Sequence, residues 1–156
     1  CREADSAVSM LQKFAFNFVS TNSFHLNGDQ KGGQYSSLTY RPFTLEGNFA
    51  FAQGVQELLI QTREGVIEVF PAIPESWKDV SFHTLRAEGA FLLSAVKENG
   101  MVKEVVVKSE SDGTCLLRLP FQNWTITGID KSKVKVRDGV MMVPMGKGQS
   151  VRMSNE

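Results

Sequence analysis

Apolar residues recur with a period near 3.6 in the first third of the chain and alternate with polar residues in the remainder. Between Ala4 and Val19, apolar side chains fall on one side of a helical wheel, and polar residues such as Gln12 fall on the other. A second stretch, from about Asn48 to Thr62, has similar spacing. These stretches predict two amphipathic helices.

A long segment from Thr21 to Gly47 separates the two predicted helices. Loops of this length are uncommon inside compact domains, and they are usually functional or disordered. We expect an ordered or partly ordered loop here. The second helix is expected to end at Arg63-Glu64-Gly65, because glycine suits the backbone conformation that follows a helix C-terminus.

From residue 66 onward, short stretches rich in alternating apolar residues are separated by tight-turn dipeptides. Asn99-Gly100 is the strongest short hairpin signal, Asp112-Gly113 is another tight turn, and Asp138-Gly139 predicts a further hairpin. Many short strands at this spacing favour an antiparallel sandwich or barrel. We therefore predict a mainly β fold, an antiparallel β-sandwich of about eight strands preceded by two helices. The predicted domains are a helical one at 1–64 and a β-sandwich at 65–156.

Composition narrows the choice of partner. The chain has 17 Lys+Arg and 17 Asp+Glu, so its formal net charge is zero. Nucleic-acid binding needs a basic excess or stripe, which the sequence lacks, and no apolar run reaches the ~18 residues of a membrane helix. Cys1 and Cys115 set no disulfide framework. Cys1 is compatible with a lipid-modified residue of an exported protein or with an arbitrary chain start.

The most distinctive segment lies where the loop enters the second helix, from Tyr40 to Phe49. Glu46 is placed near a helix N-terminus, where partial positive charge favours a carboxylate, and Gly47 permits a close backbone approach. Aromatic residues surround this pair, as expected of walls that stack on sugar rings. The alternative interpretation is structural: Glu46 and Asn48 cap a helix, and the phenylalanines belong to the core.

Two further runs follow this segment in a defined order. Arg-Pro-Phe-Thr-Leu-Glu-Gly-Asn-Phe (residues 41–49) precedes Gly-Val-Ile-Glu-Val-Phe-Pro (residues 65–71), and Trp77 comes next. Together these motifs resemble the C-terminal portion of glycoside hydrolase family 95, whose members include α-L-fucosidases and α-L-galactosidases. The resemblance covers about residues 2–120. It implies that the two helices resemble the last helices of an (α/α)6 catalytic barrel and that a β-domain packs after them.

The resemblance also implies roles for individual residues. The family's motif reads His-Pro-Pro-Phe-Gln-Ile-Asp-Gly-Asn-Phe, and its Asp assists the base side of an inverting hydrolysis. Glu46 stands at that Asp and is the implied catalytic residue, whereas Tyr40 stands at the His and Arg41 replaces the first Pro. The implied substrate-binding residues are Tyr40, Arg41, Asn48 and Phe49. No metal and no cofactor is implied.

Inverting hydrolysis requires two carboxyl groups ~6.5–9.5 Å apart, and the family's general acid lies in barrel helices upstream of this segment. We therefore expect the segment to be inactive alone and to act, within a longer parent, on α-L-fucosyl or related glycans. The resemblance further implies a bacterial protein exported to the periplasm or cell surface. The alternative function is a non-catalytic glycan-binding or structural β-sandwich module.

The remaining candidate groups favour structural roles. His25 and His83 lack cysteine or carboxylate partners at metal-ligand spacing. Cys115 is expected in the β core. Trp77 and Trp124 are expected to pack against neighbouring side chains, although with Phe121 they are also candidates for a sugar-stacking platform.

Apolar helix faces that have lost their barrel context are expected to pack on the β half or on another copy of the chain. Homo-oligomerisation through exposed helix faces is therefore predicted. The residues proposed for such a dimer contact are Phe14, Phe18 and Phe51.

Overall fold

The computed structural model describes residues 3–38 and 41–155. The chain divides into two compact units. The first comprises Cys1–Leu58 and Ala72–Pro74, and the second comprises Leu59–Pro71 and Glu75–Glu156. The predicted domain boundary between residues 64 and 65 stays a prediction, because compactness alone does not show that either part folds independently.

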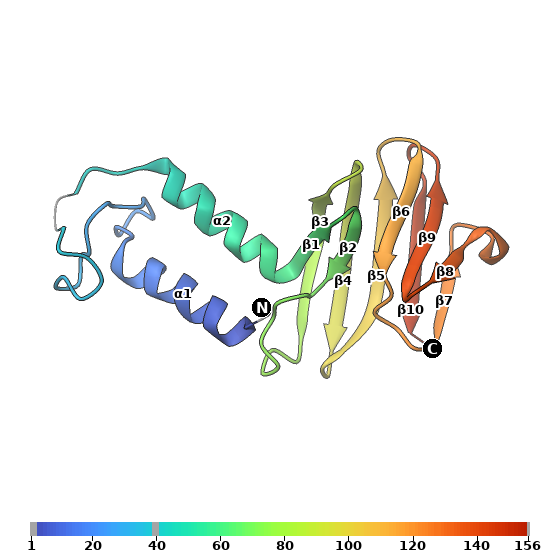
Figure 1. The fold of residues 1–156 in the computed structure, drawn as a ribbon, viewed down its shortest axis with the longest axis horizontal. Helices are drawn as coiled ribbons and strands as arrows, with labels where there is room; N and C mark the ends of the chain where they lie inside the picture. Colours follow the sequence, from blue (N-terminus) through green and yellow to red (C-terminus); the bar gives the residue numbers. More distant parts are fainter. Residues whose placement is uncertain (1–2, 39–40, 156) are drawn as a thin grey trace. The chain divides into compact units, whose positions relative to one another are not determined.

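The first unit contains two helices, α1 (Ala4–Asn17) and α2 (Leu45–Leu59), joined by the long loop (Figure 1). Both helices begin close to their predicted positions. Two isolated bridges order the described part of the loop, Val19 with His25 and Leu26 with Phe43. The loop is thereby folded back on itself and leads directly into the first turn of α2.

Aromatic side chains hold the helical unit together. The Phe14 ring stacks on Phe51 of α2 with centroids 5.5 Å apart, and it lies 6.3 Å from the Phe18 ring. Leu11 approaches α2 at Gly54, where a β-carbon would lie 2.9 Å from the Leu11 side chain. Phe14, Phe18 and Phe51 are partly buried and contact one another through the Phe14 ring, and their role in a dimer contact stays a prediction.

The end of the second helix also differs from the prediction. The helix stops at Leu59, and β1 (Ile60–Arg63) pairs antiparallel with β2 (Val66–Val69). Glu64 and Gly65, both with positive φ, form the tight turn of this hairpin instead of a helix C-cap. The reason is tertiary: Ile60 is buried opposite Val69 in the hairpin, and such packing overrides a local preference for helix.

The second unit consists of two five-stranded sheets (Figure 1). One sheet has the order β1-β2-β6-β9-β8, and the other has the order β3-β4-β5-β10-β7. The strands not yet defined are β3 (Val80–Ala87), β4 (Phe91–Glu98), β5 (Met101–Ser109), β6 (Gly113–Arg118), β7 (Trp124–Thr127), β8 (Lys135–Arg137), β9 (Val140–Met145) and β10 (Ser150–Asn155). All strand pairs are antiparallel except β2 with β6. The predicted mainly β fold, a sandwich preceded by two helices, is confirmed.

The core of the sandwich follows the period of two that the sequence shows. On each central strand alternate side chains are buried between the sheets, because successive residues of a strand point to opposite faces. The fully buried members include Leu93, Val105, Val107, Cys115, Leu117, Met141, Val143, Val151 and Met153. The sequence pattern does not predict strand β7, because two polar residues alternate with a half-buried tryptophan and isoleucine over only four positions. Its pairing with β10 fixes it in the sheet.

Candidate functional site

The segment that carries the family-like motif forms the entry into α2. Pro42 accepts a hydrogen bond from the Asn27 amide, and the Phe43 ring lies 5.3 Å from the Phe24 ring. Thr44 donates its backbone N–H to the His25 carbonyl, just before the helix begins at Leu45. These contacts tie the motif to the earlier part of the loop, so its backbone has a defined path into the helix.

Glu46 lies in the first turn of α2, and its side chain is exposed. The unpaired N–H groups of a helix N-terminus favour a carboxylate there. Arg41 is also exposed, five residues earlier in the chain. Tyr40 lies outside the described residues. The structure therefore presents the predicted catalytic carboxylate and the predicted guanidinium to solvent on one short stretch of chain.

Asn48 connects α2 to the loop through both ends of its amide. Its Oδ1 accepts the His25 backbone N–H at 2.8 Å, and its Nδ2 donates to the Ser23 carbonyl at 2.7 Å. The side chain therefore positions the loop against the first turns of the helix. A direct contact between Asn48 and a sugar stays a prediction, as do the sugar contacts of Arg41 and Phe49.

His25 contacts both α1 and the residue that precedes α2, and the sequence alone does not predict these contacts. Its ring stacks on Phe14 at 5.1 Å, and its Nδ1 lies 2.6 Å from the Thr44 hydroxyl oxygen. That hydroxyl has one proton and donates it to Asn27 Oδ1 at 3.1 Å. His25 therefore carries its proton on Nδ1 and donates to Thr44. His25 and Thr44 are 19 positions apart in the sequence, and no local spacing predicts this cluster.

Gly47 is required by the close approach of His25. A β-carbon at this position would lie less than 3.0 Å from three atoms of the imidazole ring. The predicted close approach at Gly47 is therefore present, and its partner is a side chain of the same chain.

We expect Gly47→Ala to destabilise the helical unit by about 2 kcal/mol. Overpacking against the fixed ring costs up to about 3 kcal/mol. The better helix propensity of alanine offsets about 1 kcal/mol of this cost. The measurement is urea denaturation followed by circular dichroism at the helix band. The matched control is His25→Ala/Gly47→Ala, where the steric conflict is gone and alanine at 47 should stabilise relative to His25→Ala alone. Equal destabilisation in both backgrounds would contradict the assigned contact.

Asp29 organises the part of the loop from residue 29 to residue 35. Its carboxylate is buried, with Oδ1 accepting the Lys31 N–H at 2.7 Å and Oδ2 accepting the Tyr35 N–H at 2.9 Å. The backbone hydrogen bonds from Tyr35 and Lys31 lower the pKa of Asp29 below its ordinary value. Asp29 therefore remains ionised as a structural group, and both of its oxygens are committed to the loop.

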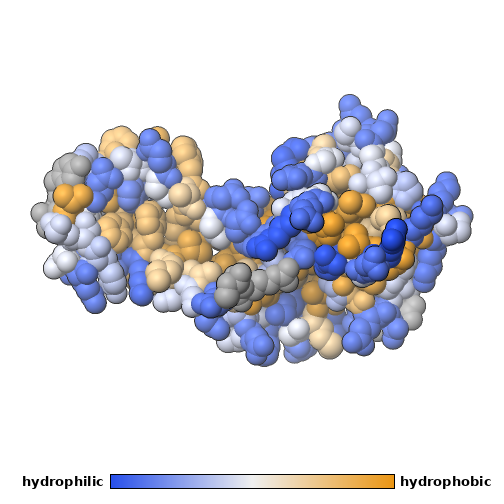
Figure 2. All heavy atoms as spheres, in the orientation of Figure 1, coloured by the Kyte–Doolittle hydropathy of each residue, from blue (hydrophilic) through white to orange (hydrophobic). Residues whose placement is uncertain are grey.

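Exposed apolar side chains surround Glu46 along the chain. Phe49 is 68% exposed and Phe43 is 59% exposed, and Leu45 is exposed as well. Figure 2 shows hydrophobic residues at the surface of the helical unit on the side drawn. Carbohydrate sites combine aromatic faces with a small number of polar groups, and this stretch has both. The purely structural alternative, with these phenylalanines in the core, does not describe Phe43 and Phe49.

The other candidate residues occupy structural or surface positions. Trp124 packs partly against the β core, and the Lys131 ammonium lies 4.5 Å from the centre of its ring. Phe121 is buried and Trp77 is 39% exposed, so the three aromatics do not share one open platform. His83 is exposed on β3. These positions leave the segment from Arg41 to Phe49 as the principal candidate site.

Cys115 lies in the sandwich core, as expected. Burial raises the pKa of its thiol to about 12, so the thiolate does not form at neutral pH. Among residues 3–38 and 41–155, no three histidine, cysteine or acidic side chains lie close enough together to hold a metal ion. Within the same described part of the chain, no helix is both long and apolar enough to span a membrane.

The fold is a two-sheet β-sandwich preceded by two helices, with the motif at the start of the second helix. A family model, described as glycoside hydrolase family 95, C-terminal domain, matches residues 61–153. The chain belongs to glycoside hydrolase family 95. It is also similar to Alpha-L-fucosidase 2 of Arabidopsis thaliana, with 32% identity over 83 residues. That match covers 51% of this chain and 10% of the relative's length.

Proposed function

We propose that the chain is the C-terminal part of a longer inverting glycoside hydrolase of the α-L-fucosidase type. The observation that carries the proposal is the position of Glu46: an exposed carboxylate in the first turn of α2, at the family's acid position, beside exposed aromatic side chains. Membership of the family and similarity to Alpha-L-fucosidase 2 support this activity class. The substrate class is α-L-fucosyl or related glycans, and the parent is exported to the periplasm or cell surface.

The two faces of α2 support a parent with further helices. Phe51 and Gly54 face α1, whereas Leu45 and Phe49, on the other side of the helix, are exposed. A helix that is apolar on opposite sides is typical of the interior of a larger helical assembly. The exposed side of α2 therefore fits a neighbouring helix of the parent, and this arrangement would place Glu46 at the rim shared by several helices.

In the proposed mechanism Glu46 acts on the water that attacks the anomeric carbon, either as a proton acceptor or by orienting that water beside other polar groups. The departing sugar oxygen needs a proton from an acid on the opposite face of the ring. Asp29 is not available for that role, because both of its oxygens accept backbone N–H groups. The general acid therefore comes from the upstream part of the parent. In this proposal Arg41 donates hydrogen bonds to sugar hydroxyls.

The proposal is tested by comparing the full-length parent with this chain on p-nitrophenyl α-L-fucoside and on α-1,2-linked fucosyl and galactosyl oligosaccharides. We expect turnover by the parent, no turnover by the chain alone, and initial formation of the inverted anomer, which NMR detects directly. The proposal would be overturned if the parent hydrolysed none of these substrates or formed the retained anomer. Binding without turnover would instead support the non-catalytic module.

A further inference from the structure

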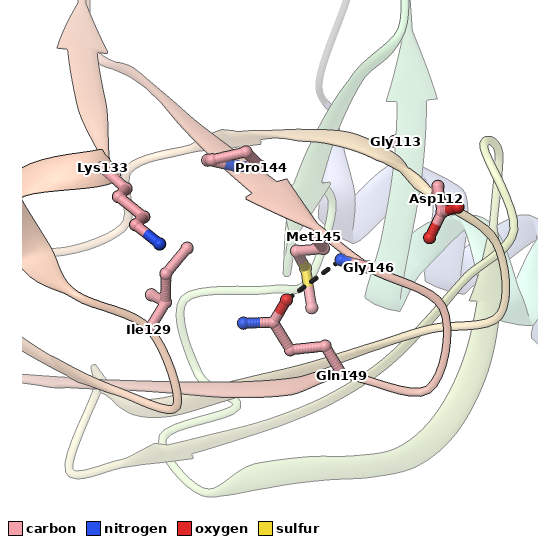
Figure 3. Close-up of a pocket in the computed structure, with 8 residues that line it drawn as sticks. All are labelled: Asp112, Gly113, Ile129, Lys133, Pro144, Met145, Gly146 and Gln149. Carbon is pink, nitrogen blue, oxygen red and sulfur yellow. Dashed lines mark hydrogen bonds between the residues drawn. The ribbon is translucent and has the colours of Figure 1, made fainter.

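An open pocket of about 340 Å³ lies at one end of the β unit (Figure 3). It forms where β6 begins, β9 ends and β10 begins, beside the connection from β7 to β8. The lining residues are Asp112, Gly113, Ile129, Lys133, Pro144, Met145, Gly146 and Gln149. Its volume lies at the lower end of the range of small-molecule sites, about 300–1,000 Å³.

Hydrogen bonds fix the walls of this pocket. The Gln149 amide accepts the Gly146 N–H at 3.0 Å through Oε1 and donates to the Gly128 carbonyl at 2.8 Å through Nε2. Asp112 Oδ1 accepts the Lys147 N–H at 2.7 Å, which ties the turn before β6 to the turn after β9. The pocket is therefore a preformed feature of the sandwich, and a ligand would not have to order its walls.

The chemistry of the lining is amphipathic. Ile129, Pro144 and Met145 supply apolar surface, and Met145 is itself buried in the core. Figure 3 shows Asp112 and Lys133 toward opposite ends of the pocket, with Met145 between them. One carboxylate and one ammonium provide an acceptor and a donor whose charges cancel. This combination suits a neutral ligand that has an apolar face and several hydroxyl groups.

We propose that the pocket binds one neutral pyranose unit of a glycan. The C–H face of the ring packs on Ile129, Pro144 and Met145, while hydroxyl groups donate to Asp112 and accept from Lys133. The choice of a sugar over another small polyol rests on the proposed function. The pocket lies in the β unit, whereas Glu46 lies in the helical unit, so the two sites are tested independently.

The test is a titration of the ¹⁵N-labelled chain with L-fucose and, separately, with L-galactose, followed by two-dimensional NMR. Glycerol at equal concentration is the control for solvent effects. We expect saturable shifts at the Gly113, Gly146 and Gln149 amides with Kd on the order of millimolar. Lys133→Met should weaken binding about tenfold through the lost charged donor. Lys135→Met, which removes an exposed charge from β8 outside the pocket, should leave Kd unchanged.

Gly146→Ala provides a second variant that keeps the fold. The new methyl would lie 3.7 Å from Asp112 Oδ1, an ordinary contact, and would narrow the pocket beside the carboxylate. We expect it to weaken binding at least as much as Lys133→Met. Unchanged Kd in both variants, or no saturable shift at the pocket with either sugar, would overturn the inference. Shifts confined to residues 41–49 would overturn the proposed pocket while supporting the proposed function. Saturable shifts at the pocket, together with a parent that hydrolyses none of the test substrates, would support the pocket and overturn the proposed function.

Discussion

Replacing Glu46 with glutamine is expected to lower kcat of the full-length parent about 1,000-fold with little change in stability. General acid–base groups contribute roughly 10²–10⁴-fold to rate, and glutamine keeps the size of the side chain while removing its ability to accept a proton. The side chain is exposed in the first turn of α2, so the fold loses at most a weak interaction with the helix dipole. The measurement is kcat and KM on a fucosyl substrate, together with the thermal midpoint.

The matched control is Glu57→Gln, an exposed carboxylate three turns further along the same helix. It should leave kcat within about twofold, because surface substitutions away from a site rarely matter. Glu46→Asp is informative as well, since it restores the acid that the family motif carries. Full activity in Glu46→Gln, or an equal loss in Glu57→Gln, would remove Glu46 from the catalytic group.

The second large effect is expected from Leu117→Ala, which should destabilise the β unit by about 3–4 kcal/mol. Leu117 is fully buried on β6, opposite Ile67 of β2 and Met141 of β9. Deleting a buried leucine side chain removes its transfer free energy and leaves a cavity that neighbours from both strands cannot fill without moving. A loss of this size is a large part of the 5–15 kcal/mol that stabilises a typical domain.

Urea denaturation followed by tryptophan fluorescence would report this loss, because Trp124 packs against the same core. The control is Leu116→Ala on the same strand, where the side chain points to the opposite face and is only partly buried. Its expected cost is less than half that of Leu117→Ala. Equal costs for the two variants would contradict the placement of Leu117 between the sheets.

Local periodicity was sufficient to predict most of the β unit. The turns at Asn99-Gly100 and Asp138-Gly139 have both residues at positive φ, the conformation that these dipeptides favour. The prediction failed at residues 60–63, because the stretch Ile-Gln-Thr-Arg is too short for periodicity to distinguish helix from strand. Pairing with Val66–Val69 decided in favour of the strand, and no local signal contains that information.

The candidate site was predicted as a motif, and the packing around it was not. Glu46 and Gly47 were identified from residue type and from their place before a helix. His25 and Asn27 had no such signal, because long-range loop closure brings them against Thr44. Helical spacing likewise shows that Phe14 and Phe51 lie on apolar faces, but not that these two faces pack against each other.

The sequence by itself determined the two helices, most of the strands and the sandwich class, and it gave Glu46 as the candidate acidic residue. Each of these depends on nearby residues, on their periodicity or on a contiguous motif. The tertiary structure decided which apolar faces are buried together, where α2 gives way to a strand, and how His25 and Asn48 position the loop. It also brought Asp112, Lys133 and Met145 to one pocket. Contacts between residues distant along the chain depend on how the whole chain closes, and local patterning does not encode that closure.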